Sequence, residues 1–168
     1  RSMDGIDALI TAAGVFRGTL VPVDELEAEV WDTVLDVNLR GAFLAVKHSV
    51  PAMKRGGGGV VLLIASVGGV TGGSSSVAYG ASKGGVHGLA MTLQSQLELH
   101  GIRVNDLCPG NIATPLMDRA LRDMVSAGQG DLVEERKARL ANPDGVARVL
   151  AFLVSDDADY VRGTVFTR

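Results

Sequence analysis

Short apolar runs alternate along this chain with longer stretches whose apolar residues recur every three or four positions. The short runs predict strands at 6–11, 60–65, 102–107 and 163–166. The longer stretches predict helices over 24–54, 77–100 and 142–154, together with a polar, methionine-containing helical insertion over about 115–140. Because Val60 to Ala65 is apolar at every position, it reads as a parallel strand buried on both faces. The pattern predicts an α/β fold with a doubly wound parallel sheet.

Residues with special backbone or capping properties mark the ends of these elements. Asp24, with Glu27 three residues later, predicts a helix N-cap. Pro51 predicts a kink or a late turn in the helix that it interrupts, and Gly101 ends the long helix before the third strand. Pro143 suits the first turn of the last helix.

Composition places the chain among globular proteins and narrows its partners. The 168 residues are 46% hydrophobic and 21% charged, which suits one domain with a sizeable core. A net charge of -3 argues against a general nucleic-acid binder. No apolar run approaches the roughly 20 residues of a membrane helix, and the N-terminus does not resemble a signal peptide. The lone Cys108 excludes an intrachain disulfide and suits a reducing compartment, so we expect a cytoplasmic protein with no membrane partner.

Tyr79 and Lys83 are the residues that most strongly suggest chemistry. Residues four apart share one face of a helix, so the phenol and the ammonium are expected to point into the same cleft. A free tyrosine has a pKa of about 10, and a nearby ammonium favours the phenolate and lowers that pKa. Such a pair is a plausible acid and base for interconverting an alcohol and a carbonyl. Taken alone, the spacing also occurs by chance on solvated helices.

Two further residues add to this pair. Ser66 follows the strand ending at Ala65, and ligands of open parallel sheets gather at the carboxyl ends of their strands. Asn38 interrupts an apolar helix, where a buried amide requires hydrogen-bond partners. A turn serine and a structural asparagine are the alternative readings.

The residues described above belong to a longer series of motifs, namely Ala13-Gly14, Asn38, Ser66, Tyr79-x-x-x-Lys83 and Pro109-Gly110-x-x-x-Thr114. In the order and spacing of these motifs, the chain resembles the short-chain dehydrogenase/reductase family over essentially its whole length. The resemblance implies a Rossmann-like, NAD(P)-dependent oxidoreductase that interconverts a secondary alcohol and a ketone by hydride transfer. Tyr79 would be the general acid/base. Lys83 would lower its pKa and bind the nicotinamide ribose, Ser66 would hold the substrate oxygen, and Asn38 would hold a water of the proton relay.

The same resemblance implies a cofactor site, a substrate loop and a self-association surface. Residues 115–140 would close over the substrate, and the helices at 24–54 and 77–100 would join subunits into a homodimer or homotetramer. No metal is expected. The cofactor-binding residues would be Ala12, Ala13, Gly14, Asn38, Tyr79, Lys83, Pro109, Gly110, Ile112 and Thr114.

The chain departs from the family pattern near its N-terminus. Thr11-Ala12-Ala13-Gly14 stands where the family usually has Asn-Asn-Ala-Gly. A dinucleotide fold also needs a glycine-rich turn between a first strand and a helix. Gly56–Gly59 precedes a strand, and after Ser66 the loop continues, with no helix expected to begin at once. We therefore expect the sheet to be incomplete on its N-terminal side and clipped at its C-terminus, with the residue that selects NAD or NADP outside the chain.

The sequence also contains features of two other functions. Gly80-Ala81-Ser82-Lys83-Gly84 matches the G-x-S-x-G motif of hydrolases, but no strand precedes Ser82 and no suitable acid and histidine follow, so a hydrolase is excluded. A non-catalytic fragment that serves only as an assembly or interaction module stays open, because glycines four apart on the long helix permit close helix approach. His87 is expected on a helix surface or interface, Cys108 in the core, and Trp31 in packing.

Overall fold

The computed structural model describes residues 5–168 and contains one parallel sheet with helices on both faces. The strands pair in chain order, and every neighbouring pair is parallel, which confirms the predicted α/β fold with a doubly wound sheet. They are β1 (Ala8–Thr11), β2 (Gly59–Ile64), β3 (Ile102–Cys108) and β4 (Gly163–Phe166). The helices are α1 (Ala28–Leu35), α2 (Gly41–Gly56), α3 (Val67–Val70), α4 (Val77–Glu98), α5 (Pro115–Ser126), α6 (Gly130–Ala138) and α7 (Pro143–Val154), with a π-helical turn at Asp36–Arg40 and a 3-10 turn at Asp156–Ala158.

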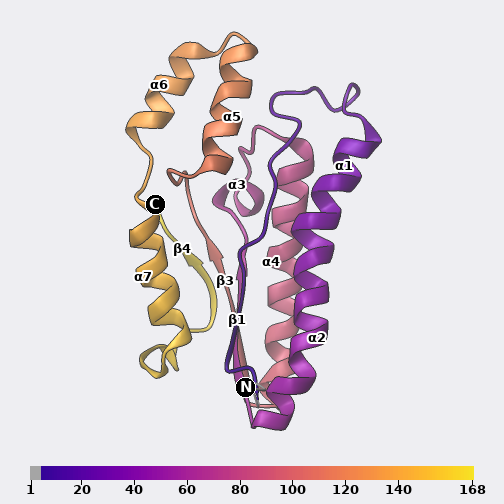
Figure 1. Cartoon of the computed structure of the whole chain (residues 1–168), viewed down its shortest axis with the longest axis vertical. Helices are drawn as coiled ribbons and strands as arrows, with labels where there is room; N and C mark the ends of the chain where they lie inside the picture. The colour runs from indigo at the N-terminus through magenta and orange to yellow at the C-terminus, as the bar shows by residue number, and fades with distance from the viewer. Residues whose placement is uncertain (1–4) are drawn as a thin grey trace.

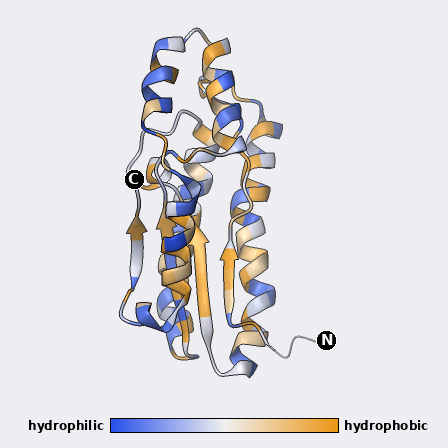
Figure 2. Ribbon diagram, turned by 60° about the vertical axis from the view of Figure 1, so that its left-hand side comes forward, coloured by the Kyte–Doolittle hydropathy of each residue, from blue (hydrophilic) through white to orange (hydrophobic). Residues whose placement is uncertain are grey.

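Helices cover both faces of the sheet (Figure 1), and each face packs against them in a separate apolar core. Because successive side chains of a strand point to opposite faces, Val61 and Leu63 of β2 pack with α2 and α4, whereas Leu62 packs with α7. All three side chains are fully buried. Figure 2 shows the hydrophobic colour of the central strands between their more mixed helices. Burial on both faces accounts for the unbroken apolar run that predicted this strand.

Helices α5 and α6 stand beyond the carboxyl ends of the strands, and we call residues 115–140 the α5–α6 cap (Figure 1). The α5–α6 cap has a small hydrophobic core of its own, formed by Leu121, Met124 and Val133. Leu20, from the segment that follows β1, packs against this core. The cap is thus attached to the rest of the fold near the edge where the predicted chemistry lies.

Two predicted element boundaries are wrong. Asp24 is not an N-cap: α1 begins at Ala28 and Glu27 precedes it without a side-chain cap, because the chain forms a turn in which Glu25 N–H donates to the Pro22 carbonyl. A helix does begin directly after Ser66, namely the single turn α3. Its glycines serve close packing there, since a Cβ on Gly69 would lie 2.6 Å from Cβ of Lys83 on α4.

The helix predicted over 24–54 is divided by the π-helical turn Asp36–Arg40, which holds Asn38 in a buried position. π-turns are rare and often accompany functional sites. Pro51 lies inside α2 and does not end it. Among residues 5–168, every helix falls short of the length or the apolar character that crossing a bilayer demands.

Candidate active site

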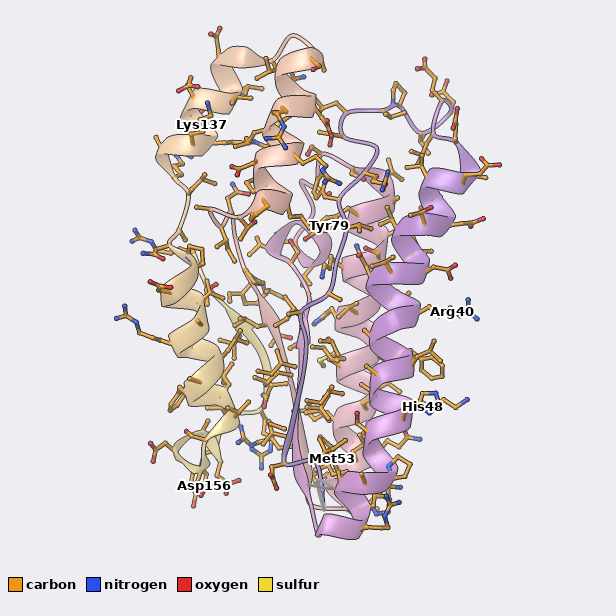
Figure 3. The ribbon with its side chains drawn as sticks, in the orientation of Figure 1. Arg40, His48, Met53, Tyr79, Lys137 and Asp156 are labelled. Atoms are coloured by element: carbon orange, nitrogen blue, oxygen red, sulfur yellow. The ribbon has the colours of Figure 1, made fainter. Side chains whose placement is uncertain are left out.

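A cleft of about 700 Å³ opens at the carboxyl edge of the sheet, beneath the α5–α6 cap. It is lined by three of the four predicted catalytic residues, Ser66, Tyr79 and Lys83. Figure 3 shows Tyr79 at this end of the molecule, below the cap helices. The connection between β2 and α3, which holds Ser66, and the helix α4 therefore meet where open parallel sheets bind their ligands.

Tyr79 is placed by the first turn of α4. Ser76 is the N-cap of this helix: its hydroxyl accepts from the Tyr79 backbone N–H at 3.1 Å and donates to the Arg17 carbonyl at 2.6 Å. Burial raises the pKa of Tyr79 above its ordinary value, and the hydroxyl of Ser66 beside the phenol lowers it by a smaller amount. The pKa of Tyr79 thus lies above its usual range, not below it as the sequence analysis expects. At neutral pH the phenol holds its proton and is ready to donate it.

Lys83 lies one turn further along α4 and is almost completely buried. Its Nζ donates to the Ile64 carbonyl at 2.6 Å and lies 5.8 Å from the centroid of the Tyr79 ring. Burial lowers the pKa of Lys83 to about 8. An ammonium has three donors, so two stay available for a ligand in the cleft.

Asn38 does not line the cleft but holds one of its edges in place. Its Oδ1 accepts from the Val15 N–H at 2.8 Å, and its Nδ2 donates to the Val15 carbonyl at 3.0 Å and to Ser82 Oγ at 3.0 Å. The amide therefore joins the π-turn, α4 and the segment that follows β1. Both of its N–H donors are used, and a part in a proton relay stays a prediction.

Most of the predicted cofactor residues also come together. Those that line the cleft come from the end of β1, from α4 and from the segment after β3, whereas Ala13 and Asn38 lie outside its lining. Thr114 has a structural task as well, since its hydroxyl caps α5 by accepting from the Met117 N–H at 3.3 Å. The cleft-lining members are Ala12, Gly14, Tyr79, Lys83, Pro109, Gly110, Ile112 and Thr114.

Phe16 is a cleft residue that the sequence analysis missed. It lines the same cleft, and its ring packs on the ring of Tyr79 with the centroids 4.3 Å apart and the planes inclined by 37°. The available signal was its position, because Phe16 follows the end of β1 at the ligand-binding edge of the sheet. The α6 residues Leu132 and Arg136 also reach the cleft and were not singled out.

Two other residues singled out in the sequence, Cys108 and His87, are not among those that line the cleft. Cys108 is fully buried, which confirms its place in the core. His87 is partly exposed, and its Nδ1 lies 2.9 Å from Oδ2 of Asp106, a buried carboxylate of β3. Thr164 of β4 donates to the other oxygen of this carboxylate at 2.8 Å. These side chains join α4, β3 and β4 beside the site.

Comparison with known proteins connects this geometry to a family. The family model described as short chain dehydrogenase matches residues 1–125. Levodione reductase of Leifsonia aquatica is 34% identical over 165 residues, covering 95% of this chain and 61% of the relative. Cyclopentanol dehydrogenase of Comamonas sp. (strain NCIMB 9872) is 34% identical over 161 residues, covering 96% of this chain and 63% of the relative.

A solved structure shares the fold. The crystal structure of levodione reductase matches with a TM-score of 0.88 at 33% identity, covering 96% of this chain and 65% of that one. The chain spans about three fifths of the length of the curated relatives described above.

Proposed function

Because the chain belongs to the short-chain dehydrogenase/reductase family, we propose that the protein is an NAD(P)-dependent oxidoreductase that interconverts a secondary alcohol and a ketone. The observation that carries this proposal is the meeting of Ser66, Tyr79 and Lys83 in one cleft. A relative named for cyclopentanol, which is a secondary alcohol, supports the substrate class.

Tyr79 is the proton donor and acceptor in this proposal. In the direction of reduction, the substrate oxygen lies between the hydroxyls of Ser66 and Tyr79, and the protonated phenol donates to it as the alcohol forms. In the direction of oxidation, the phenolate accepts the same proton. The Ser66 hydroxyl orients the substrate oxygen, and Lys83 stabilises the phenolate through its charge, 5.8 Å from the ring centroid.

The donors around Lys83 fit the nicotinamide ribose of a dinucleotide. The ammonium has two donors beyond its bond to the Ile64 carbonyl, and a ribose offers two hydroxyl acceptors. Gly14 and the segment Pro109–Thr114 lie beside it in the cleft and would border the nicotinamide ring. When bound, the nucleotide supplies or accepts the hydride. These residues suit NAD and NADP equally.

The α5–α6 cap is, in this proposal, the substrate lid of a single Rossmann-like domain. Leu116 and Met117 of α5 and Leu132 of α6 give the cleft apolar lining, and the cap also contributes the charged residues Glu135, Arg136 and Arg139. The apolar lining suits the hydrocarbon part of a small alcohol or ketone. The compartment we propose is the cytoplasm, since the free thiol of Cys108 is buried and unpaired.

A second copy of this chain is the partner we propose, bound through the helices within 24–54 and 77–100. Both regions expose large apolar side chains, with Phe43 on α2 45% exposed and Met91 on α4 50% exposed. Sedimentation of the wild type and of F43E and M91E tests this contact. A shift toward monomer in the variants supports it, and an unchanged mass in both contradicts it.

The substitution Tyr79→Phe tests the enzymatic proposal. It removes the proton donor and keeps the ring, so turnover of secondary alcohols and ketones is expected to fall by about 10²–10⁴-fold, the range typical for a general acid or base. Calorimetric titration with NADH and NADPH, in which binding is expected to persist, separates loss of chemistry from loss of cofactor.

Undiminished turnover in Y79F would contradict the role of Tyr79. A wild type that binds neither nucleotide, turns over no alcohol or ketone, and still self-associates would instead support the assembly module.

A further inference from the structure

Phe16 holds one face of the proposed catalytic ring. The tilted aromatic contact is close, with centroids 4.3 Å apart, just below the range of about 4.5–7 Å for favourable aromatic pairs. A tyrosine side chain rotates about two bonds, and its hydroxyl lies at the far end of the ring, so a small rotation moves the hydroxyl by a large distance. A packed neighbour on the ring restricts that motion without touching the hydroxyl.

The backbone around Phe16 is fixed on both sides. Before it, Asn38 binds both the N–H and the carbonyl of Val15. After it, the Arg17 carbonyl accepts from the hydroxyl of Ser76, and the Leu20 N–H donates to the Ser75 carbonyl at 2.6 Å. The Phe16 ring therefore cannot leave Tyr79 by a small shift of its own segment.

The same bonds tie Phe16 to the helix that carries Tyr79. Ser76 Oγ contacts the Arg17 carbonyl and the Tyr79 backbone N–H at once. The two rings thus extend from backbones joined through one hydroxyl, which sets their separation. At its far end the segment meets the cap, where Thr19 Oγ1 donates to Asp123 of α5 at 3.2 Å.

We propose that Phe16 is a positioning residue, which holds the Tyr79 ring so that its hydroxyl stays beside Ser66 and the substrate oxygen. The proposal rests on the proposed function, because it assigns Phe16 a task only if Tyr79 transfers the proton. Its expected size follows from geometry: the aromatic contact alone is worth about 2- to 10-fold, and a misplacement of 1 Å at a reacting group costs up to about 100-fold.

The test compares F16A with F16Y, which retains the ring, and with F152A, which makes the same truncation at an exposed site of α7. We expect F16A to lower kcat by about tenfold or more with KM changed less than about threefold, because the lost function is orientation rather than binding. F16Y and F152A are expected to keep kcat within about threefold. Should F16A fail to fold, F16L carries the same test, since it keeps apolar volume and lacks the flat ring.

A pH profile supplies a readout that a purely structural role would leave unchanged. Burial raises the pKa of Tyr79, and removing the Phe16 ring admits water to the phenol. In F16A the rise of kcat/KM for alcohol oxidation is therefore expected at lower pH than in the wild type.

Three results would overturn the proposal. A raised KM with unchanged kcat would make Phe16 only a surface for substrate binding. Equal losses of kcat in F16A and F16Y would show that the ring is not the property required, and an unchanged pH profile beside a lowered melting temperature would leave a structural role. A fully active Y79F would instead remove the proposed function itself, so the two failures are distinguishable.

Discussion

Replacing Asn38 with alanine should measure how firmly the segment after β1 is held to the rest of the fold. Asn38 is 2% exposed and makes three hydrogen bonds, two to the backbone of Val15 and one to Ser82. The alanine leaves the N–H and carbonyl of Val15 and the hydroxyl of Ser82 without these partners. At about 1 kcal/mol for each bond, we expect the free energy of unfolding to fall by about 3 kcal/mol. For a chain of this size that corresponds to a drop in melting temperature of about 6–12 °C.

The substitution Ser82→Ala is the matched control. It removes one of the three bonds of Asn38, together with a bond from Ser82 to the Tyr79 carbonyl within α4. At the same value for each bond, we expect S82A to cost about 2 kcal/mol. Because the two residues share a bond, the double variant should cost about 1 kcal/mol less than the sum of the single ones.

Urea unfolding followed by the fluorescence of Trp31 and by circular dichroism provides the free energies. A loss below 1 kcal/mol for N38A would refute the reasoning, since it would mean that water replaces all three bonds at no cost. Equal losses for N38A and S82A would show that the two bonds to Val15 together contribute no more than the single bond from Ser82 to the Tyr79 carbonyl.

Three further changes test other parts of the structure. Asp106→Ala leaves Thr164 and His87 without their acceptor, and urea unfolding should show a loss of about 2 kcal/mol; no loss would contradict the described bonds. Lys83→Met removes a buried ammonium whose pKa is lowered to about 8, so the free energy of unfolding of the variant at pH 7 should exceed that of the wild type by up to about 3 kcal/mol. Lys83 binds its proton more tightly in the unfolded wild type than in the folded one, so the stability of the wild type should rise between pH 8 and 10. The difference in stability between variant and wild type should therefore become smaller over this range. A constant difference would refute burial of the ammonium as its cause. Thr19→Val removes the hydrogen bond to Asp123, and amide hydrogen exchange should become faster in residues 115–140 but not in α4. An equal increase of the exchange rate in both regions would contradict a local effect of this bond.

Local sequence patterns were sufficient to predict the elements of the sheet. The run before Ser66 is apolar because both of its faces are covered, and Tyr79 and Lys83 share a helix face whatever surrounds them. The features that were missed depend on partners distant in the sequence. Asn38 lies in a π-turn next to Val15 and Ser82, and Phe16 meets a tyrosine 63 residues away. The direction of the Tyr79 pKa shift likewise depends on burial, which spacing along a helix does not reveal.

The boundaries that were wrong have the same origin. Asp24 has the residue type of an N-cap, but the turn at Pro22 places the helix start further along the chain. The glycines after Ser66 suggested an extended loop, whereas they allow α3 to approach α4 closely. A residue type that is favoured at helix ends or in loops also occurs elsewhere in a fold, and tertiary contacts determine where each helix begins.

The distribution of the helices over the two faces of the sheet determines the handedness of the connections between its strands. The strands follow one another in the same direction across the sheet, yet α2 and α4 cover one face and α7 covers the other (Figure 1). The crossover from β3 to β4 therefore has the opposite handedness to the crossovers from β1 to β2 and from β2 to β3. Connections between parallel strands of one sheet are right-handed in about 98% of cases. A connection that changes face must carry the chain over an edge of the sheet, and residues 109–142 do so at the carboxyl edge. The chain leaves this connection and returns to it at one place, since the Ala113 N–H donates to the Ala141 carbonyl at 3.0 Å and the Ala141 N–H donates to the Asn111 carbonyl at 2.8 Å. The cover above the cleft is thus an excursion inserted into the one crossover that changes face.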